Sequence, residues 1–192
     1  DSSYALGLHG PCATYDTACS AALVACHAGL RALQLGECAD GLALGVTLML
    51  VPGVGASYAV AGMTSASGRS HTFDARADGY VRGEACGAVV LRTTADAMGL
   101  GMRGSAVRQD GRSASLTAPN GQAQQGLLSA ALADAHVVPD ALALLEAHGT
   151  GTALGDPIET GSLEGAVLSR RHVSAVGALA MGGVKANIGH AE

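Results

Sequence analysis

No charged residue occurs between Gly41 and Gly68, and this feature restricts the possible folds more than any other. Residues 41–51 are strongly apolar, which raises the question of a membrane-spanning helix. Such a helix needs about 20 consecutive apolar residues. Pro52 ends the run well before that length, and glycine and serine are frequent after it. The run therefore predicts a fully buried strand over 42–50 followed by a loop of small residues, and no membrane is implied.

The remainder of the chain alternates between strand-like and helix-like segments. Strands are predicted over 11–15, 88–91, 142–145 and 177–184. Helices are predicted over 20–35 and 122–135, and a third begins at Pro157 with Asp156 as its cap. The first of these helices is expected to be buried on nearly all sides, because Arg31 is its only charge. A tight turn is expected over 16–19, and loops over 108–121 and 149–155. This alternation predicts an α/β fold with a buried sheet, without a linker or repeat.

The charge and cysteine patterns exclude several classes of protein. Charged residues make up 14% of the chain and hydrophobic residues 48%, which excludes a disordered chain. A net charge of −5 without a basic block argues against nucleic acid as a partner. The five cysteines are odd in number and form no CxxC motif. We therefore expect free thiols in a reducing, cytoplasmic compartment and no zinc site.

The first candidate site is the segment Asp16-Thr17-Ala18-Cys19-Ser20, which places a cysteine between a predicted strand and a predicted helix. The dipole and the unpaired N–H groups at the start of a helix stabilise a thiolate. A strand-turn-helix placement also exposes the side chain, as in nucleophile elbows. A cysteine in this position is more often a passive small residue, so a catalytic role requires partners elsewhere in the chain.

The second candidate site is the loop Glu-Ala-His-Gly-Thr-Gly-Thr at 146–152, directly after a predicted strand. This position suits a side chain that projects into a cleft, and it is occupied by His148. Thr150 and Thr152 alternate, so both hydroxyls can face the same side. A lone histidine on such a loop is usually structural, but the crowding of glycine, threonine and histidine favours a functional role.

The third candidate site is the segment Lys-Ala-Asn-Ile-Gly-His at 185–190, which follows another predicted strand. Lys185 could form an ion pair with an acid such as Glu159, since a buried lysine needs such a partner. His190 ends the segment and supplies a second histidine. One cysteine and two histidines on three separate loops indicate thiolate catalysis, which suits either a cysteine hydrolase or an acyltransferase.

A set of motifs in one order makes the chain resemble the β-ketoacyl synthase (ketosynthase) domain of type I modular polyketide synthases. The strings that carry the resemblance are 10–20, 72–74, 78–84, 109–113, 116–121, 146–159 and 185–190. They extend over almost the whole chain, and together they are very specific, although each alone is modest. The Thr-Ala-Cys form at 17–19 and the His-Gly-Thr-Gly-Thr form at 148–152 are more typical of polyketide synthases than of bacterial fatty-acid condensing enzymes. The stretch from 92 to 104 is shorter than is usual in the family.

The resemblance implies a thiolase-like fold, in which two related halves form an αβαβα sandwich. On this basis residues 1–192 are a partial ketosynthase domain, roughly its middle half. They would comprise the end of the N-terminal half from the nucleophile strand onward and the beginning of the C-terminal half, with no second domain. We expect this fragment alone to be inactive.

The resemblance also implies roles for the three candidate catalytic residues. Cys19 would be the nucleophile that accepts an acyl chain as a thioester. His148 and His190 would hold the thioester carbonyl of a malonyl-type extender and stabilise the enolate that decarboxylation leaves. The activity implied is therefore decarboxylative condensation in polyketide, or related fatty acid, biosynthesis.

Further residues and partners follow from the same resemblance. The residues expected to support the site are Lys185, Glu159 and Asp156, and those expected to bind the phosphopantetheine arm are Thr150, Thr152 and Asn187. The arm belongs to an acyl carrier protein, so no cofactor is bound directly and no metal is needed. The family is dimeric through the edge strand before the nucleophile, which here would be the segment 11–15.

A second interpretation is a non-elongating relative that binds carrier proteins or serves as a dimer partner. Such relatives usually lose the nucleophile or one of the histidines, whereas this sequence contains all three. A cysteine hydrolase would leave most of the motifs unexplained. A condensing enzyme is therefore the leading prediction.

Overall fold

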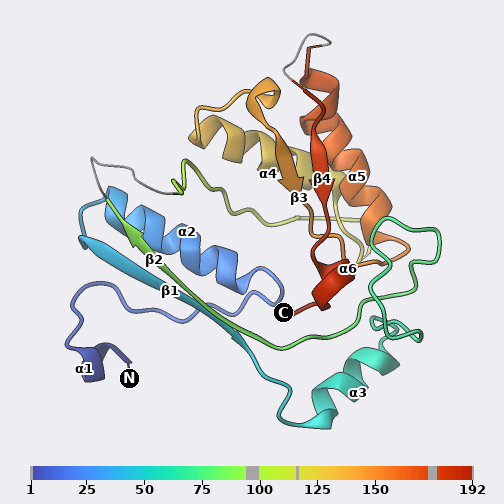
Figure 1. The fold of residues 1–192 in the computed structure, drawn as a ribbon, viewed down its shortest axis with the longest axis horizontal. Helices are drawn as coiled ribbons and strands as arrows, with labels where there is room; N and C mark the ends of the chain where they lie inside the picture. The colour runs from blue at the N-terminus through green and yellow to red at the C-terminus, as the bar shows by residue number, and fades with distance from the viewer. Residues whose placement is uncertain (1, 94–99, 116, 173–176, 192) are drawn as a thin grey trace. The chain divides into compact units, whose positions relative to one another are not determined.

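The computed structural model describes residues 2–93, 100–115, 117–172 and 177–191. These residues form two compact units (Figure 1). The first contains the described residues of 1–48 and 84–102, and the second contains those of 49–83 and 103–191. Residues 94–99 of the shortened stretch and Leu116 of the quoted motif lie outside the described residues.

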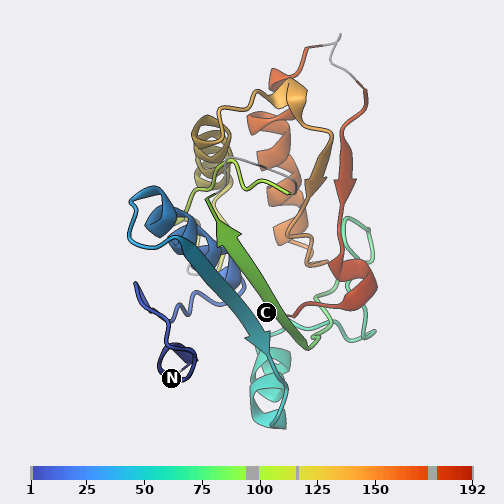
Figure 2. The same ribbon diagram turned by 60° about the vertical axis from the view of Figure 1, so that its left-hand side comes forward.

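The first unit is a helix packed on a two-stranded sheet. Its elements are α1 (Ser2–Leu6), α2 (Ala21–Gln34), β1 (Asp40–Thr47) and β2 (Ala85–Arg92). The strands are antiparallel, with Asp40 opposite Arg92 and Thr47 opposite Ala85, and α2 lies along one face of the pair (Figures 1 and 2). An ion pair between the Asp40 carboxylate and the Arg92 guanidinium closes one end of the ladder.

Small residues bring α2 and the two strands unusually close together. A side chain at Gly45 on β1 would place its Cβ 3.0 Å from the Cβ of Ala22 on α2. A side chain at Gly29 on α2 would place its Cβ 3.1 Å from Cδ1 of Leu91 on β2. Part of the chain's glycine excess therefore serves helix–sheet contact, because a larger residue at either position would push the layers apart.

Three predictions for the first unit need correction. The strand predicted over 11–15 does not form within the described chain, because these residues pair with no other strand. The predicted strand over 42–50 ends at Thr47, and Ala43 is its only fully buried residue. Helix α2 was expected to be buried on nearly all sides, but Leu23 is 73% exposed. The strands β1 and β2 pack against one face of α2, and Leu23 lies outside that covered face.

The second unit contains the remaining elements. They are α3 (Pro52–Val60), α4 (Gly121–Asp134), η1 (Pro139–Ala141), β3 (Leu144–Glu146), α5 (Gly155–Ala166), η2 (Leu168–Arg170), β4 (Ala180–Gly182) and α6 (Lys185–Ile188). Strands β3 and β4 are parallel and in register from the pair Leu144–Ala180 to the pair Glu146–Gly182. Helices α4 and α5 pack side by side on the same side of these strands (Figures 1 and 2).

The core of this unit lies along α5. Leu163, Ala166 and Val167 are buried. The buried hydroxyl of Ser162 donates a hydrogen bond to the carbonyl oxygen of Ile158, 2.7 Å away, and is also 3.2 Å from that of Gly121 at the start of α4. Because one acceptor lies on α5 and the other at the start of α4, the serine joins the two helices without leaving a buried hydroxyl unsatisfied.

The second unit also departs from the predictions. Pro52 begins helix α3 instead of a loop, since proline lacks the N–H that a first helical turn leaves unbonded anyway. Helix α5 begins at Gly155, so Pro157 is its third residue and Asp156 lies within the first turn instead of capping it. The short strand expected to be buried over 142–145 forms as β3, but Leu144 is 62% exposed.

No helix in the described part of the chain is both long and apolar enough to span a membrane.

Helix α4 has a side-chain cap at its start. The side-chain oxygen of Asn120 accepts hydrogen bonds from the N–H groups of Gln122 (3.1 Å) and Ala123 (3.2 Å). Its amide nitrogen donates to the carbonyl oxygens of Asp110 (2.9 Å) and Arg112 (3.2 Å). The residue therefore caps the helix and anchors the preceding loop at once.

Replacing Asn120 with Ala is expected to lower the free energy of unfolding by about 0.5–2 kcal/mol, because the cap and the loop anchor are lost together. Urea denaturation of the protein measures this change. Gln122→Ala is the matched control, since the Gln122 side chain is exposed and its loss should change the free energy of unfolding by about 0.5 kcal/mol or less. Equal destabilisation by the two substitutions would contradict the capping role.

Candidate active site

Cys19 lies in a tight turn immediately before helix α2, as predicted. The backbone of Ala18 is left-handed, with a φ of 52°, which is uncommon for a residue other than glycine. Hydrogen bonds hold this conformation: the Thr17 and Ser20 hydroxyls are 2.8 Å apart, and the N–H of Ala21 donates to the carbonyl of Ala18 at 3.0 Å. The cysteine side chain is exposed. The strained turn thus presents the sulfur at the start of a helix.

The loop that carries His148 is built around the carboxylate of Glu159. One carboxylate oxygen accepts a hydrogen bond from the N–H of His148 at 2.6 Å, and the other accepts from the N–H of Gly149 at 2.8 Å. Glu159 lies on α5, so the helix fixes the backbone at His148 directly. The direct ion pair predicted between Lys185 and Glu159 is not among the ion pairs of the described residues. Both oxygens of the Glu159 carboxylate accept backbone N–H groups instead.

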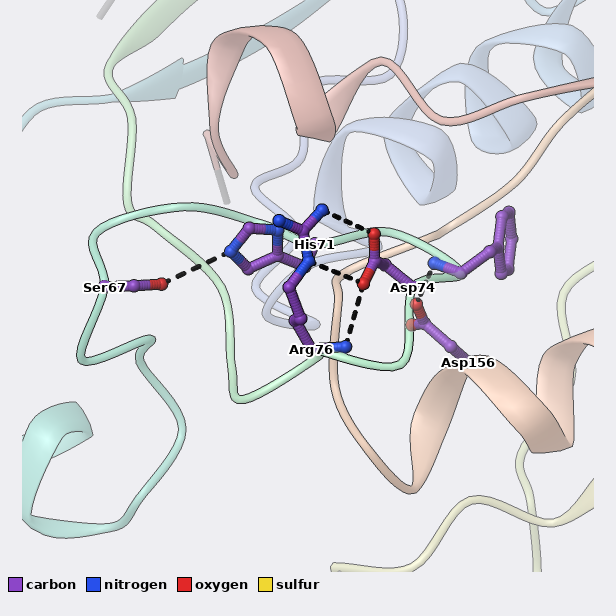
Figure 3. Close-up of polar contacts among 6 residues, drawn as sticks. Ser67, His71, Asp74, Arg76 and Asp156 are labelled. Carbon is purple, nitrogen blue, oxygen red and sulfur yellow. Dashed lines mark hydrogen bonds and ion pairs between the residues drawn. The ribbon is translucent and has the colours of Figure 1, made fainter.

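The carboxylate of Asp156 holds the other end of the same loop. It is buried and accepts hydrogen bonds from the N–H groups of Gly151 (3.1 Å) and Thr152 (3.3 Å). It also accepts from the N–H of Phe73 at 2.8 Å (Figure 3). The sequence suggested a helix cap at this position, but the structure makes Asp156 the joint between α5, the histidine loop and the segment around Phe73.

Glycine is required at two positions of the histidine loop. Gly149 and Gly151 have φ values of +51° and +79°, in the left-handed region. A side chain at Gly149 would place its Cβ 2.6 Å from Cγ2 of Thr72, and one at Gly151 would place its Cβ 2.7 Å from the backbone nitrogen of His71. The loop therefore passes too close to the segment 70–73 for any larger residue.

The hydroxyls of Thr150 and Thr152 face each other, as the alternation predicted. Their Oγ1 atoms are 3.3 Å apart, and the N–H of Gly155 donates to that of Thr152 at 3.1 Å. The pair shares one hydroxyl hydrogen, so the second can be donated to a bound acceptor. Asn187, the third residue expected to bind the same group, lies on α6 with an exposed side chain.

His190 is held by its backbone and packed by its ring. Its N–H donates to the carbonyl of Val81 at 2.7 Å, and its carbonyl accepts from the N–H of Gly83 at 2.8 Å. The ring is buried, with the ring of Tyr80 edge-on at a centroid distance of 5.0 Å. The ring of His148 lies 5.5 Å away, also edge-on. The structure thus brings together two histidines from loops that are far apart in the sequence.

The pKa of His148 lies below its ordinary value of 6.5. Partial burial of the ring is the main cause, because desolvation disfavours the charged form. The positive charge of Lys185 lowers this pKa further, while the carboxylates of Glu159 and Asp156 act in the opposite direction. The net shift of the His148 pKa is downward, which favours the neutral ring, and Lys185 contributes to this shift through its charge.

Sequence reasoning missed three residues that shape the site. Tyr80 packs against His190, Thr72 donates a hydrogen bond to the carbonyl of Gly149 at 2.5 Å, and the Glu146 carboxylate accepts one from the N–H of Val184 at 2.6 Å. All three belong to strings that carry the family resemblance, but their roles depend on contacts that no local pattern reveals.

Next to Thr72, the turn at 74–76 is closed by the Asp74–Arg76 ion pair, and Ser67 contacts His71 at 3.5 Å (Figure 3).

Replacing Lys185 with Met is expected to raise the pKa of His148, because the nearby positive charge that disfavours protonation is removed. Lys185→Arg keeps the charge and should leave the pKa low. Histidine titration followed by NMR distinguishes the two. An unchanged pKa in Lys185→Met would show that the charge of Lys185 does not act on His148.

The lowered pKa of His148 also determines how the stability of the protein depends on pH. Since the folded-state pKa is depressed, the contribution of His148 to stability is present above about pH 6.5 and is lost as the pH falls toward the folded-state pKa. Lys185→Met should reduce this acid-side loss.

Comparisons with known proteins agree with this geometry. The family model for the β-ketoacyl synthase N-terminal domain matches residues 2–97, and that for the C-terminal domain matches residues 101–192. A phenolphthiocerol/phthiocerol polyketide synthase of Mycobacterium tuberculosis is 46% identical over 99% of this chain, which spans 12% of that protein. The polyketide synthase GfsA of Streptomyces halstedii is 47% identical over 99% of the chain, which spans 3% of that protein.

Solved structures show the same similarity in three dimensions. The oxazolomycin ketosynthase domain OzmH KS7 of Streptomyces albus JA3453 matches this chain with a TM-score of 0.91 and 37% sequence identity. The match covers 98% of this chain and 33% of the OzmH KS7 chain. The ketosynthase from module 6 of the bacillaene synthase of Bacillus subtilis 168 has the same score and identity, and 34% of its length is covered. The chain thus spans about a third of these structures, and the predicted thiolase-like fold is confirmed. On its sequence and its structure alike, the chain belongs to the β-ketoacyl synthase family, and its relatives are modular polyketide synthases.

Proposed function

We propose that this chain carries the reacting groups of a β-ketoacyl synthase that performs decarboxylative condensation in polyketide, or related fatty acid, biosynthesis. The observation that supports this most strongly is the pair formed by His148 and His190 at 5.5 Å, in a chain of this family. Two imidazoles side by side are suited to stabilising a developing oxyanion, since each can offer an N–H donor.

The first step would use Cys19. Its thiolate attacks the acyl thioester on an acyl carrier protein, and the pantetheine thiol leaves as the acyl group moves to Cys19. The left-handed Ala18 turn exposes this sulfur, and the N-terminus of α2 favours the thiolate over the thiol. The carrier leaves, and a carrier loaded with a malonyl-type extender takes its place.

The second step would use the two histidines. Their N–H groups hold the thioester carbonyl of the extender. The bond between the extender's α-carbon and its carboxylate then breaks. CO₂ leaves, and the electron pair of that bond passes into an enolate. The enolate carbon attacks the Cys19 thioester carbonyl, the Cys19 thiolate is expelled, and a β-ketoacyl chain remains on the carrier. The carboxylates of Glu159 and Asp156 accept hydrogen bonds from backbone N–H groups of the loop, so they hold the histidine loop in place.

The phosphopantetheine arm of the carrier would lie against Thr150 and Thr152. One hydroxyl hydrogen of this pair can be donated to a carbonyl of the arm, which fits the amide groups of pantetheine. Asn187 would add a polar contact from α6. The arm arrives with the carrier, so no resident cofactor or metal is part of the proposal.

The proposal extends to assembly, activity of the fragment and location. We expect the complete domain to be a homodimer through the segment 11–15, where pairing with a second copy would supply the ladder that the segment lacks. The partial ketosynthase domain of residues 1–192 is expected to be inactive alone, since side chains such as Leu23 and Val90 are 73% and 66% exposed. The cytoplasmic location also stays a prediction.

The decisive test uses the full-length protein that contains this chain, with acyl and malonyl carrier proteins as substrates. Cys19→Ala should abolish acyl loading, because the attacking thiolate is gone, while Cys38→Ala should load normally because that cysteine lies beyond the opposite end of α2. Mass spectrometry of the intact protein measures loading. Acyl loading that survives in Cys19→Ala would reject Cys19 as the nucleophile.

His148→Ala and His190→Ala should each reduce CO₂ release from malonyl carrier by about 100- to 1,000-fold, the usual cost of losing an oxyanion donor. Release of labelled CO₂ measures this step. A wild-type protein that loads acyl groups but releases no CO₂ would favour the alternative, a non-elongating domain that binds carrier proteins or pairs with an active partner.

A further inference from the structure

We propose that Thr72 is a positioning residue of this site, which holds the loop of His148 and the root of helix α6 at a set spacing. This inference rests on the proposed function, because it concerns the geometry of the groups that would stabilise the enolate. Thr72 contacts Gly149 and Gly183, so its effect would pass through their backbone.

The hydroxyl of Thr72 completes the fixing of the peptide after His148. It donates to the carbonyl oxygen of Gly149 at 2.5 Å. The N–H of the same residue is already held by Glu159 at 2.8 Å. Gly149 is buried, and glycine has more backbone freedom than any other residue. Bonds at both its N–H and its carbonyl therefore remove the freedom that would otherwise let His148 shift.

The methyl group of Thr72 occupies the space between two glycines. A Cβ at Gly149 and a Cβ at Gly183 would each lie 2.6 Å from Thr72 Cγ2. Gly183 lies at the root of α6, since its carbonyl accepts from the N–H of Ala186 at 3.0 Å. One methyl group therefore sets the distance between the His148 loop and the segment that begins with Lys185 and ends at His190.

The segment around Thr72 is itself held on both sides, so it can act as a rigid support. The hydroxyl of Ser70 accepts from the N–H of Val81 at 3.1 Å, in the segment that bonds the backbone of His190. The N–H of Phe73 donates to the Asp156 carboxylate, and Phe73 has a strained φ of 56°. A residue in a strained, multiply bonded segment suits precise placement better than general stabilisation.

The hydroxyl is tested with two near-isosteric substitutions in the full-length protein. Thr72→Val keeps the methyl group but removes the hydroxyl, so the Gly149 carbonyl loses this hydrogen-bond donor. CO₂ release from malonyl carrier should fall by about 10-fold or more, since misplaced groups lose rate steeply. Acyl loading of Cys19 from a small thioester that lacks the pantetheine arm needs neither histidine nor the Thr150–Thr152 pair, so it should stay within about 2-fold of wild type. Thr72→Ser keeps the donor but lacks the methyl group, so its CO₂ release should lie between those of Thr72→Val and wild type.

The outcomes separate three cases. A Thr72→Val protein that loses loading and CO₂ release equally, or loses neither, would overturn the positioning role. Loss of CO₂ release alone, at a melting temperature close to that of wild type, would support it. A wild-type protein that neither loads nor releases CO₂ would overturn the proposed function, and this inference with it.

The methyl group is tested by a compensating pair. Gly183→Ala should lower CO₂ release, because its Cβ would meet Thr72 Cγ2. In the Thr72→Ser background that Cγ2 is absent. The loss of CO₂ release caused by Gly183→Ala should therefore be smaller there by about 5-fold or more, as is usual for residues in direct contact. Equal costs of Gly183→Ala in both backgrounds would show that the methyl group does not set this spacing.

Discussion

The saturation of two carboxylates by backbone N–H groups is the interaction on which the rest of the site depends. Glu159 and Asp156 lie one turn apart on α5, and together they bind four N–H groups of the loop from His148 to Thr152. Charged acceptors make stronger hydrogen bonds than neutral ones. A glycine-rich loop, which would otherwise have many conformations, is thereby fixed to a helix. The position of His148 follows from a helix, although the residue itself lies in a loop.

Close packing is the second constraint, and it explains why so many residues are small. In the first unit, Gly45 and Gly29 allow α2 to approach the sheet. In the second, Gly149 and Gly183 make room for Thr72. A chain with one phenylalanine and no tryptophan has few large side chains to bridge wide gaps between layers. It must bring backbones together, and each close approach requires a residue with no or little side chain.

Local signals predicted a good part of this structure. The helix expected over 122–135, the turn at Cys19 and the alternating hydroxyls of Thr150 and Thr152 depend on neighbours within a few residues, and all three formed as expected. Pro52 was interpreted as the end of an apolar run, although a proline is equally suited to begin a helix. The burial of α2 was overestimated because an apolar sequence shows what a helix can bury, and not which face is covered.

By itself, the sequence determined the family, the three candidate catalytic residues and the loops that carry them, because those motifs lie in short strings with distinctive composition. Only the tertiary structure decided what each carboxylate holds. Asp156 joins three segments instead of capping a helix, and Glu159 binds backbone N–H groups instead of Lys185. It also decided the importance of Thr72, whose hydrogen-bond acceptor is 77 residues away. The physical reason is that a carboxylate or a hydroxyl can accept many partners, and the fold alone determines which of them comes within reach.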